Sequence, residues 1–262
     1  MKSVMRMVIG VGLLSCGLNA ELFYFGVLQK ETQYREQSLL SRVKLTRLEK
    51  SVEDAWRHGM AVTDISHAPR RWSVVLSSDT GIEEQVIMRR RLMEDFRKGV
   101  RRYLHQGYEV VNVENGVGEW VALLQKGGSF RGTQMAVFRS LDALEKQIEM
   151  HKENGVYLID VEQAEGYWAA LFAKEMPFHS PRHLFVSDWE SLESAVDKAW
   201  KHSERLVNAE YVDDRWFLLF AHYTHTPSQR YIRHADFSRF RASVRKAWEE
   251  GYRLTDLAQG RR

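Results

Sequence analysis

The chain has 262 residues, of which 44% are hydrophobic and 28% are charged, so it can bury a core and is neither collagen-like nor disordered. Its 38 Lys and Arg residues stand against 35 Asp and Glu residues, which leaves little net charge. Nucleic-acid binding needs a strongly basic surface, and we therefore expect no nucleic-acid partner.

Residues 1–20 have the pattern of a secretory signal peptide. Lys2 and Arg6 supply positive charge, the apolar run 7–14 follows, and small and polar residues lead to Ala20. This order predicts export, cleavage after Ala20, and a periplasmic or secreted protein. In an alternative, the LLSC run at 13–16 is a lipobox, and lipidated Cys16 anchors the protein to a membrane. A third interpretation is an N-terminal strand segment without export.

Cys16 is the only cysteine in the chain. Either cleavage leaves no free thiol, which excludes disulfides, thiol catalysis and cysteine-based metal sites in residues 21–262. No membrane association is expected beyond the alternative lipid anchor.

Residues 21–262 contain a repeat with a period of 48 residues, visible in five independent columns. The aromatic column is Tyr24, Trp72, Trp120, Trp168 and Trp216, and the glycine column is Gly59, Gly107, Gly155, Ser203 and Gly251. The Asp/Asn column is Asp64, Asn112, Asp160, Asn208 and Asp256. The two apolar columns are Leu48, Phe96, Leu144, Leu192 and Phe240, and Val52, Val100, Ile148, Val196 and Val244. Repeats of this length predict a fold made of stacked or ring-forming units.

Each repeat unit predicts the same elements in chain order. The aromatic column opens an apolar strand, such as residues 72–76, whose continuous hydrophobicity indicates burial on both faces. A polar loop and a strand around Gln85 come next, and then an amphipathic helix with apolar residues four apart, such as Leu48 and Val52. The glycine column ends the helix, and a strand carrying the Asp/Asn column follows. The buried Trp residues are expected to pack in the core, with stacking platforms for sugars or peptides as the alternative.

The two ends of the chain add to one whole unit. The segment 23–37 supplies one half and the last residues through Asp256 supply the other, and no polar capping repeat is evident. A ring needs no such caps, whereas an open solenoid does. We therefore expect one domain over residues 21–262, a closed five-fold α/β propeller whose last strand pairs beside the first. Its strand-strand-helix-strand units are those of the pentein architecture, with strands inside and helices outside. The alternative is a five-bladed β-propeller with inserted helices.

The repeat also resembles a known family. Its motif runs from Trp56 through Gly59 and Asp64 to Trp72, and again from Trp248 through Asp256. It is similar to the repeat domain of unknown function that follows the kinase domain in plant casein-kinase-like proteins and also occurs in bacterial proteins. The resemblance covers nearly all of residues 21–262. It implies a repeat fold and transfers no catalytic residue. Ser203 departs from the motif, as does the absence of a Gln from one unit.

The Asp/Asn column is the strongest candidate site. If five equivalent strands surround an axis, these side chains form a ring of oxygen atoms suited to hard cations, sugar hydroxyls or amines. That hypothesis requires the three Asp carboxylates to lie close together. In the alternative, each side chain bonds to the backbone of its own turn at the strand end.

Other residue groups are weaker candidates. His222 and His225 could bind zinc, although no carboxylate stands at a recognisable offset, and a solvated loop is favoured. No G-x-S-x-G, H-E-x-x-H or phosphate-loop motif is present, and pentein enzymes acting on guanidino groups typically need a nucleophilic Cys.

We therefore expect a monomeric, non-enzymatic binding or scaffolding module of the cell envelope, with no cofactor. It would recognise a protein partner through the loops 77–84, 125–133, 173–181 and 221–228, because loops on a rigid scaffold usually carry recognition. The alternative function is a small-ligand or cation sensor that uses the axial Asp/Asn ring.

Overall fold

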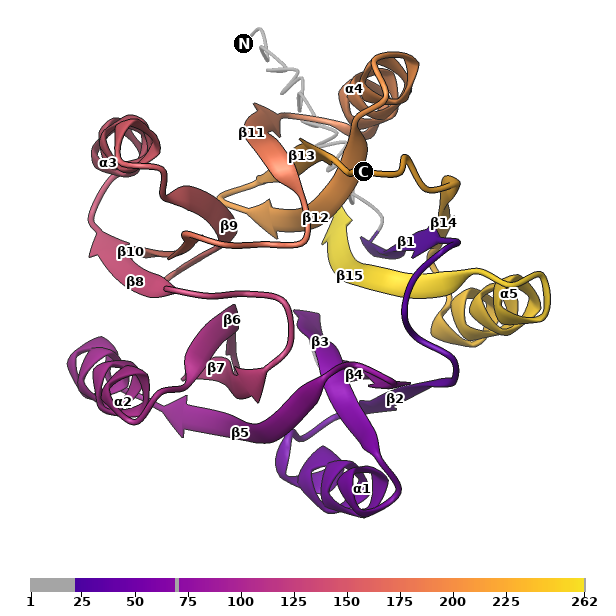
Figure 1. Ribbon diagram of the computed structural model, residues 1–262, viewed down its shortest axis with the longest axis horizontal. Helices are drawn as coiled ribbons and strands as arrows, with labels where there is room; N and C mark the ends of the chain where they lie inside the picture. The colour runs from indigo at the N-terminus through magenta and orange to yellow at the C-terminus, as the bar shows by residue number, and fades with distance from the viewer. Residues whose placement is uncertain (1–21, 69–70, 262) are drawn as a thin grey trace, which may run out of the picture.

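The computed structural model describes residues 22–68 and 71–261. In these residues the chain forms five three-stranded antiparallel sheets and five helices, arranged around a common centre with the helices outermost (Figure 1). Residues 1–21, Cys16 among them, lie outside the described residues, so the signal peptide, export and lipidation stay predictions. Within the described residues, no helix combines the length and the apolar character that a bilayer span requires.

Each sheet has an inner strand nearest the centre of Figure 1, a middle strand and an outer strand. The inner strands are β3 (Met60–Ala68), β6 (Glu109–Gly116), β9 (Tyr157–Ala164), β12 (Arg205–Val212) and β15 (Arg253–Arg261). The middle strands are β1 (Leu22–Gln29), β4 (Arg71–Ser78), β7 (Glu119–Gly127), β10 (Tyr167–Ala173) and β13 (Arg215–His222). The outer strands are β2 (Gln37–Arg42), β5 (Ile82–Arg90), β8 (Gln134–Phe138), β11 (His179–Val186) and β14 (Gln229–His234). The helices are α1 (Thr46–Arg57), α2 (Met93–His105), α3 (Leu141–Glu153), α4 (Trp189–Lys201) and α5 (Phe237–Glu249).

The order strand, strand, helix, strand occurs five times along the described chain, as the repeat predicts. The sheets are offset from these sequence units, because β2 and β3 share a sheet with β4, which opens the next unit. The first described strand, β1, lies between β14 and β15 in one sheet. Its register pairs Phe23 with Gly260 and Leu28 with Leu254. The expected pairing of the first strand with the last is therefore confirmed.

The helices follow the predicted amphipathic pattern. Leu48 and Val52 of α1 are buried, and the equivalent residues of the other four helices are buried as well. The chain leaves each helix through a residue with positive φ, which glycine adopts without strain. Gly59 has a φ of 77°, and Ser203 takes the same conformation with a φ of 64°.

The middle strands form the core. Trp72, Trp120, Trp168 and Trp216 are at most 4% exposed, so they pack inside the protein and offer no stacking surface. The residues that follow each Trp are buried in turn on both faces of the strand. This burial agrees with the continuous apolar runs in the sequence.

Every inner strand has one irregularity in its register, at the same point of the repeat. In β3 the register shifts between Val62 and Asp64, so that Thr63 is the extra residue. The other four inner strands shift at the equivalent position. A bulge of this kind re-aims neighbouring side chains. In each inner strand the Asp/Asn column directly follows this extra residue.

Candidate axial binding site

The Asp/Asn column lies on the inner strands, directly after the bulge in each. The five inner strands surround a central line, which we call the axis. All five side chains are buried, with exposures between 1% for Asp160 and 9% for Asn208. Neighbouring inner strands contact one another in the order β3, β6, β9, β12 and β15, and β15 contacts β3.

The Asp carboxylates connect neighbouring sheets through hydrogen bonds to the backbone. The Val113 N–H donates to Asp160 Oδ2 at 2.7 Å, and the Ala209 N–H donates to Asp256 Oδ2 at 3.1 Å. The backbone of Leu257 also hydrogen-bonds to Asp64, which joins the last inner strand to the first. The donor in each case is the residue that follows the Asp/Asn position of the preceding sheet. These bonds give the column a structural role.

Asp160 has hydrogen-bond partners on both oxygens. Its Oδ1 accepts from its own neighbour, the Val161 N–H, at 2.9 Å and from Asn208 Nδ2 at 3.3 Å, while Oδ2 accepts from Val113. The predicted alternative of local backbone bonding therefore occurs at this residue. It occurs inside a strand, however, and not at a turn.

Three other members of the column have an oxygen without a hydrogen-bond partner: Asp64 Oδ2, Asn112 Oδ1 and Asn208 Oδ1. All three residues line one cavity of about 320 Å³, and Asp256 lines it too. Among the described residues of the column, Asp160 alone is absent from this lining. The column thus divides into Asp160, both of whose oxygens are hydrogen-bonded, and three residues that line the cavity and have one unpartnered oxygen each.

The walls of the axial cavity come from the bulges and from loops between middle and outer strands. Thr63 and Thr255 contribute from the inner strands. The loop residues include four aromatic ones: Tyr34, Phe130, Phe178 and Tyr223. Burial raises the pKa of Tyr34, and the nearby Asp64 raises it further. The cavity therefore has a polar floor and aromatic upper walls.

Burial controls the ionisation of the axial carboxyls. It raises the pKa of Asp64 to about 8, with the charge of Asp160 as the second cause. Burial also raises the pKa of Asp160 to about 7, against the effect of its hydrogen bonds. The pKa of Asp256 is raised by burial first and by the charge of Asp64 second. A cation at this site would favour the ionised carboxylates.

A second group of axial acids was not predicted from the sequence. Glu114, Glu162 and Glu210 stand two residues after Asn112, Asp160 and Asn208, and Ser66 and Ala258 complete the column. Side chains two apart on a strand share a face, so this column was detectable from the same period. It is not evident as a repeat of one residue type, because the column contains Ser and Ala as well as Glu.

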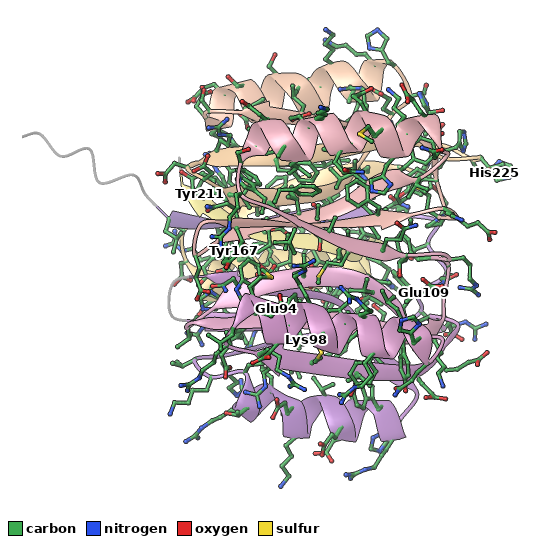
Figure 2. The ribbon with its side chains drawn as sticks, turned by 90° about the vertical axis from the view of Figure 1, so that its left-hand side faces the viewer. Glu94, Lys98, Glu109, Tyr167, Tyr211 and His225 are labelled. Atoms are coloured by element: carbon green, nitrogen blue, oxygen red, sulfur yellow. The ribbon has the colours of Figure 1, made fainter. Side chains whose placement is uncertain are left out.

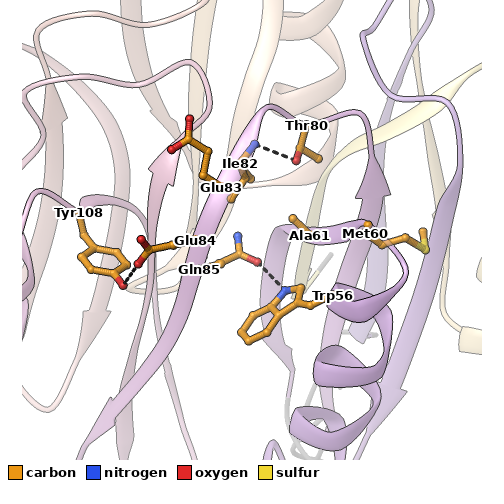
Figure 3. A pocket seen from close by; sticks show the side chains of 10 residues that line it. Trp56, Met60, Ala61, Thr80, Ile82, Glu83, Glu84, Gln85 and Tyr108 are labelled. Carbon is orange, nitrogen blue, oxygen red and sulfur yellow. Dashed lines mark hydrogen bonds between the residues drawn. The ribbon is translucent and has the colours of Figure 1, made fainter.

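A second cavity, a groove of about 370 Å³, lies between the sheet of β2, β4 and β3 and the sheet of β5, β7 and β6 (Figure 3). Gln85 Oε1 accepts from the indole N–H of Trp56 at 3.1 Å and from the backbone N–H of Val62 at 2.8 Å. Its Nε2 donates to the Val62 carbonyl at 2.7 Å. The Tyr108 hydroxyl donates to Glu84 at 2.6 Å. The groove's central polar side chains therefore already have partners.

The histidine candidates do not form a metal site. No group of three or more His, Cys, Asp or Glu side chains in residues 22–68 and 71–261 is arranged to hold a metal ion. His225 projects away from the body of the protein in Figure 2. His225 is exposed in its loop, as the sequence favoured, whereas His222 ends β13 and stacks on His179, so its predicted place in the loop is wrong.

Comparison with protein-family models, with curated proteins and with solved structures found no match to this chain.

Proposed function

We propose that the protein is a non-enzymatic binding module and that its axial cavity takes a small ligand that donates hydrogen bonds. The observation that carries this proposal is the set of unpartnered acceptors on Asp64, Asn112 and Asn208, which all line one cavity. A buried acceptor without a partner costs about 1–3 kcal/mol. A ligand with ammonium or hydroxyl donors would recover that free energy.

The aromatic walls support a cationic ligand in particular. Tyr34 and Tyr223 stand above a floor that contains Asp64 and Asp256. Aromatic faces attract organic cations, and a carboxylate supplies the opposite charge. An amine satisfies both surroundings, whereas an anion would be repelled by the ionised carboxylates of Asp64 and Asp256.

The proposal includes a closed five-fold α/β propeller of the pentein type as the scaffold. It is supported by bonds that join the two ends of the repeat: the strand pairing of β1 with β15, the bond from Leu257 to Asp64, and a clamp between Gln37 and Leu254. Gln37 Nε2 donates to the Leu254 carbonyl at 2.8 Å, and its Oε1 accepts from the Leu254 N–H at 2.7 Å. Membership of the casein-kinase-associated repeat family remains part of this proposal and rests on the Trp, Gly and Asp spacing.

Calorimetric titration of the full chain tests the binding function. Butylamine, glucose and Ca²⁺ serve as donor or cationic probes, and acetate serves as an acceptor-only control. We expect butylamine to bind and to raise the melting temperature, since a ligand that binds only the folded state stabilises it. Asp64→Asn removes the charge at constant shape, and it should weaken amine binding about tenfold or more because a charge-assisted hydrogen bond is lost.

Glu83→Gln is the matched control, because Glu83 lines the groove of Figure 3 and not the axial cavity. It should leave amine affinity unchanged. If Glu83→Gln weakens binding and Asp64→Asn does not, the site is the groove. If none of the donor or cationic probes binds, the proposed ligand-binding function is wrong.

A protein-partner scaffold is the second candidate. The predicted recognition loops gather at the mouth of the axial cavity, where Phe130, Phe178 and Tyr223 line it and Gln33 Nε2 donates to the Thr80 carbonyl. A copy of the protein with a tag after Arg262 is crosslinked in intact cells, and the recovered proteins are identified by mass spectrometry. The experiment tests this candidate together with export. Near-stoichiometric recovery of one envelope protein would support both, and recovery of background proteins alone would contradict the scaffold.

A further inference from the structure

The acidic character of the axis extends below the floor of the axial cavity. Glu114 and Glu210 are 2% and 7% exposed, two residues further along β6 and β12 than Asn112 and Asn208. At about 3.3 Å per residue, the two layers are separated by roughly 6.6 Å along the strands. We call the column of Asp64 the upper layer and the column of Glu114 the lower layer.

The lower layer repeats the bonding pattern of the upper one. The His67 N–H of the preceding sheet donates to Glu114 Oε2 at 3.1 Å, as the Val113 N–H does to Asp160. Glu162 Oε1 accepts from the Gln163 N–H at 2.8 Å. Glu114 Oε1, however, has no hydrogen-bond partner although the residue is almost fully buried.

Unpartnered acceptors therefore occur in both layers on the same two neighbouring strands. Asp64 Oδ2 on β3 and Asn112 Oδ1 on β6 lie in the upper layer, and Glu114 Oε1 on β6 lies in the lower one. Asp64 and Asp160 are also close enough to Glu114 for their charges to act on it. We call these three atoms the line of acceptors, with two in the upper layer and one in the lower layer of neighbouring strands.

The ionisable groups around this line are all acidic. After burial, the groups that raise the pKa of Glu114 are Glu162, Asp160 and Asp64, and the largest cause for Glu162 is likewise burial. The pKa of Glu210 is raised first by burial and then by four other axial carboxyls. A cationic ligand would compensate charges that these side chains cannot compensate among themselves.

The arrangement favours an extended cation over a metal ion. Six axial carboxyls lie in two layers, yet no three of the described acidic or histidine side chains are arranged to hold one metal ion. A single point charge cannot serve two layers. Two ammonium groups joined by a short alkyl chain can, because each layer then receives one donor-rich cation.

We infer that the ligand class of the axial site is a linear diamine or polyamine, with one ammonium bound by Asp64 and Asn112 and a second bound by Glu114. This inference rests on the proposed function and names its ligand. The spacing of the layers matches the separation of two amines across a four-carbon chain. The aromatic loop residues would then surround any part of a longer polyamine that extends toward the cavity mouth.

Calorimetry with putrescine and butylamine tests the inference on the full chain, because the two amines share a chain length and differ by one ammonium. We expect one putrescine per chain and an affinity at least about tenfold above that of butylamine, as expected for a second charge-assisted contact. Glu114→Gln should abolish this advantage, so that putrescine binds no more tightly than butylamine. Asp64→Asn should weaken both amines, and the exposed Glu94→Gln on α2 should change neither (Figure 2).

The outcomes separate the inference from the proposed function. Equal affinities for putrescine and butylamine, or a putrescine advantage that survives Glu114→Gln, would overturn the diamine and keep an amine site. Binding of Ca²⁺ in competition with putrescine and with higher affinity would replace the diamine by a metal ion. Thermal unfolding of each variant identifies loss of binding that comes from loss of the fold.

Discussion

Two sets of polar side chains recur with the repeat, and they differ in how completely they are bonded. Gln85 and Gln229 clamp the backbone of the preceding inner strand, with Gln229 bonded to both the N–H and the carbonyl of Leu206 at 2.9 Å. In the Asp/Asn column, oxygens of Asp64 and Asn208 remain without partners. The side chains of these Gln residues have their hydrogen-bond partners within the protein, whereas several Asp/Asn side chains do not.

The difference teaches that repetition alone does not distinguish a structural residue from a binding residue. Both sets keep their position in the 48-residue period. Buried polar groups are normally hydrogen-bonded, so the exceptions point to a missing partner. Whether each buried polar atom has a hydrogen-bond partner is therefore a better criterion for a binding site in this molecule than whether the residue is repeated.

The largest expected effect comes from the bonded set. Gln85→Leu leaves the Val62 N–H and carbonyl and the Trp56 indole without their partner, which should cost about 4 kcal/mol of unfolding free energy. Urea unfolding measures the loss. Gln106→Leu, at the exposed end of α2, is the matched control. A difference below about 1 kcal/mol between the two variants would show that the clamp contributes little.

The next effect compares two members of the Asp/Asn column at about pH 8. Asp160→Asn turns one acceptor into a donor facing other donors, because Val113, Val161 and Asn208 already donate to this carboxylate. It should therefore cost about 2 kcal/mol. Asp64→Asn removes a buried charge and should leave stability unchanged or higher. Equal losses in urea unfolding would mean that the two residues have the same role.

The smallest effect is a dependence of stability on pH. The pKa of Asp64 is 3.8 in the unfolded chain and about 8 in the folded protein. Its favourable contribution to the free energy of unfolding is therefore complete below about pH 4 and is lost as the pH rises through about 8. We expect a melting temperature higher by a few degrees at about pH 7 than at about pH 8.5. His67, whose pKa burial lowers to about 4, acts in the opposite direction only below its ordinary value of 6.5.

Asp64→Asn provides the control for this pH dependence. It should flatten the slope, and bound putrescine should flatten it as well, because the diamine stabilises the ionised carboxylates. A melting temperature that rises from about pH 7 to about pH 8.5 in the unmodified chain would contradict the raised pKa values of the axial carboxyls.

The sequence was sufficient for the features that depend on local pattern. The helix faces at Leu48 and Val52, the positive φ of Gly59 and the buried Trp strands all follow from short-range periodicity and burial. The pairing of the first strand with the last also followed, because the two half-units at the ends are complementary in sequence. These properties need only the spacing of apolar residues and glycines.

The sequence was insufficient where atoms from distant segments meet. That β2 joins the hairpin of β3 and β4 depends on pairing across 40 residues, as between Gln37 and Ser77, which the order of elements does not specify. Which oxygens are left unpartnered depends on the approach of the neighbouring strand, and Asp64 and Asp160 are chemically identical in the sequence. Glu114 escaped notice because its column mixes three residue types.

The position of β1 between β14 and β15 determines the order in which the protein can be completed during synthesis. Gln29 and Gln229 are hydrogen-bonded across 200 residues of chain. At about 5–20 residues per second, a ribosome needs roughly 10–40 s to make the intervening segment. Through that interval the apolar side chains of Phe23, Phe25 and Val27 have no sheet to enter. The sheet of β1 can therefore be completed only after the last strand has been synthesised.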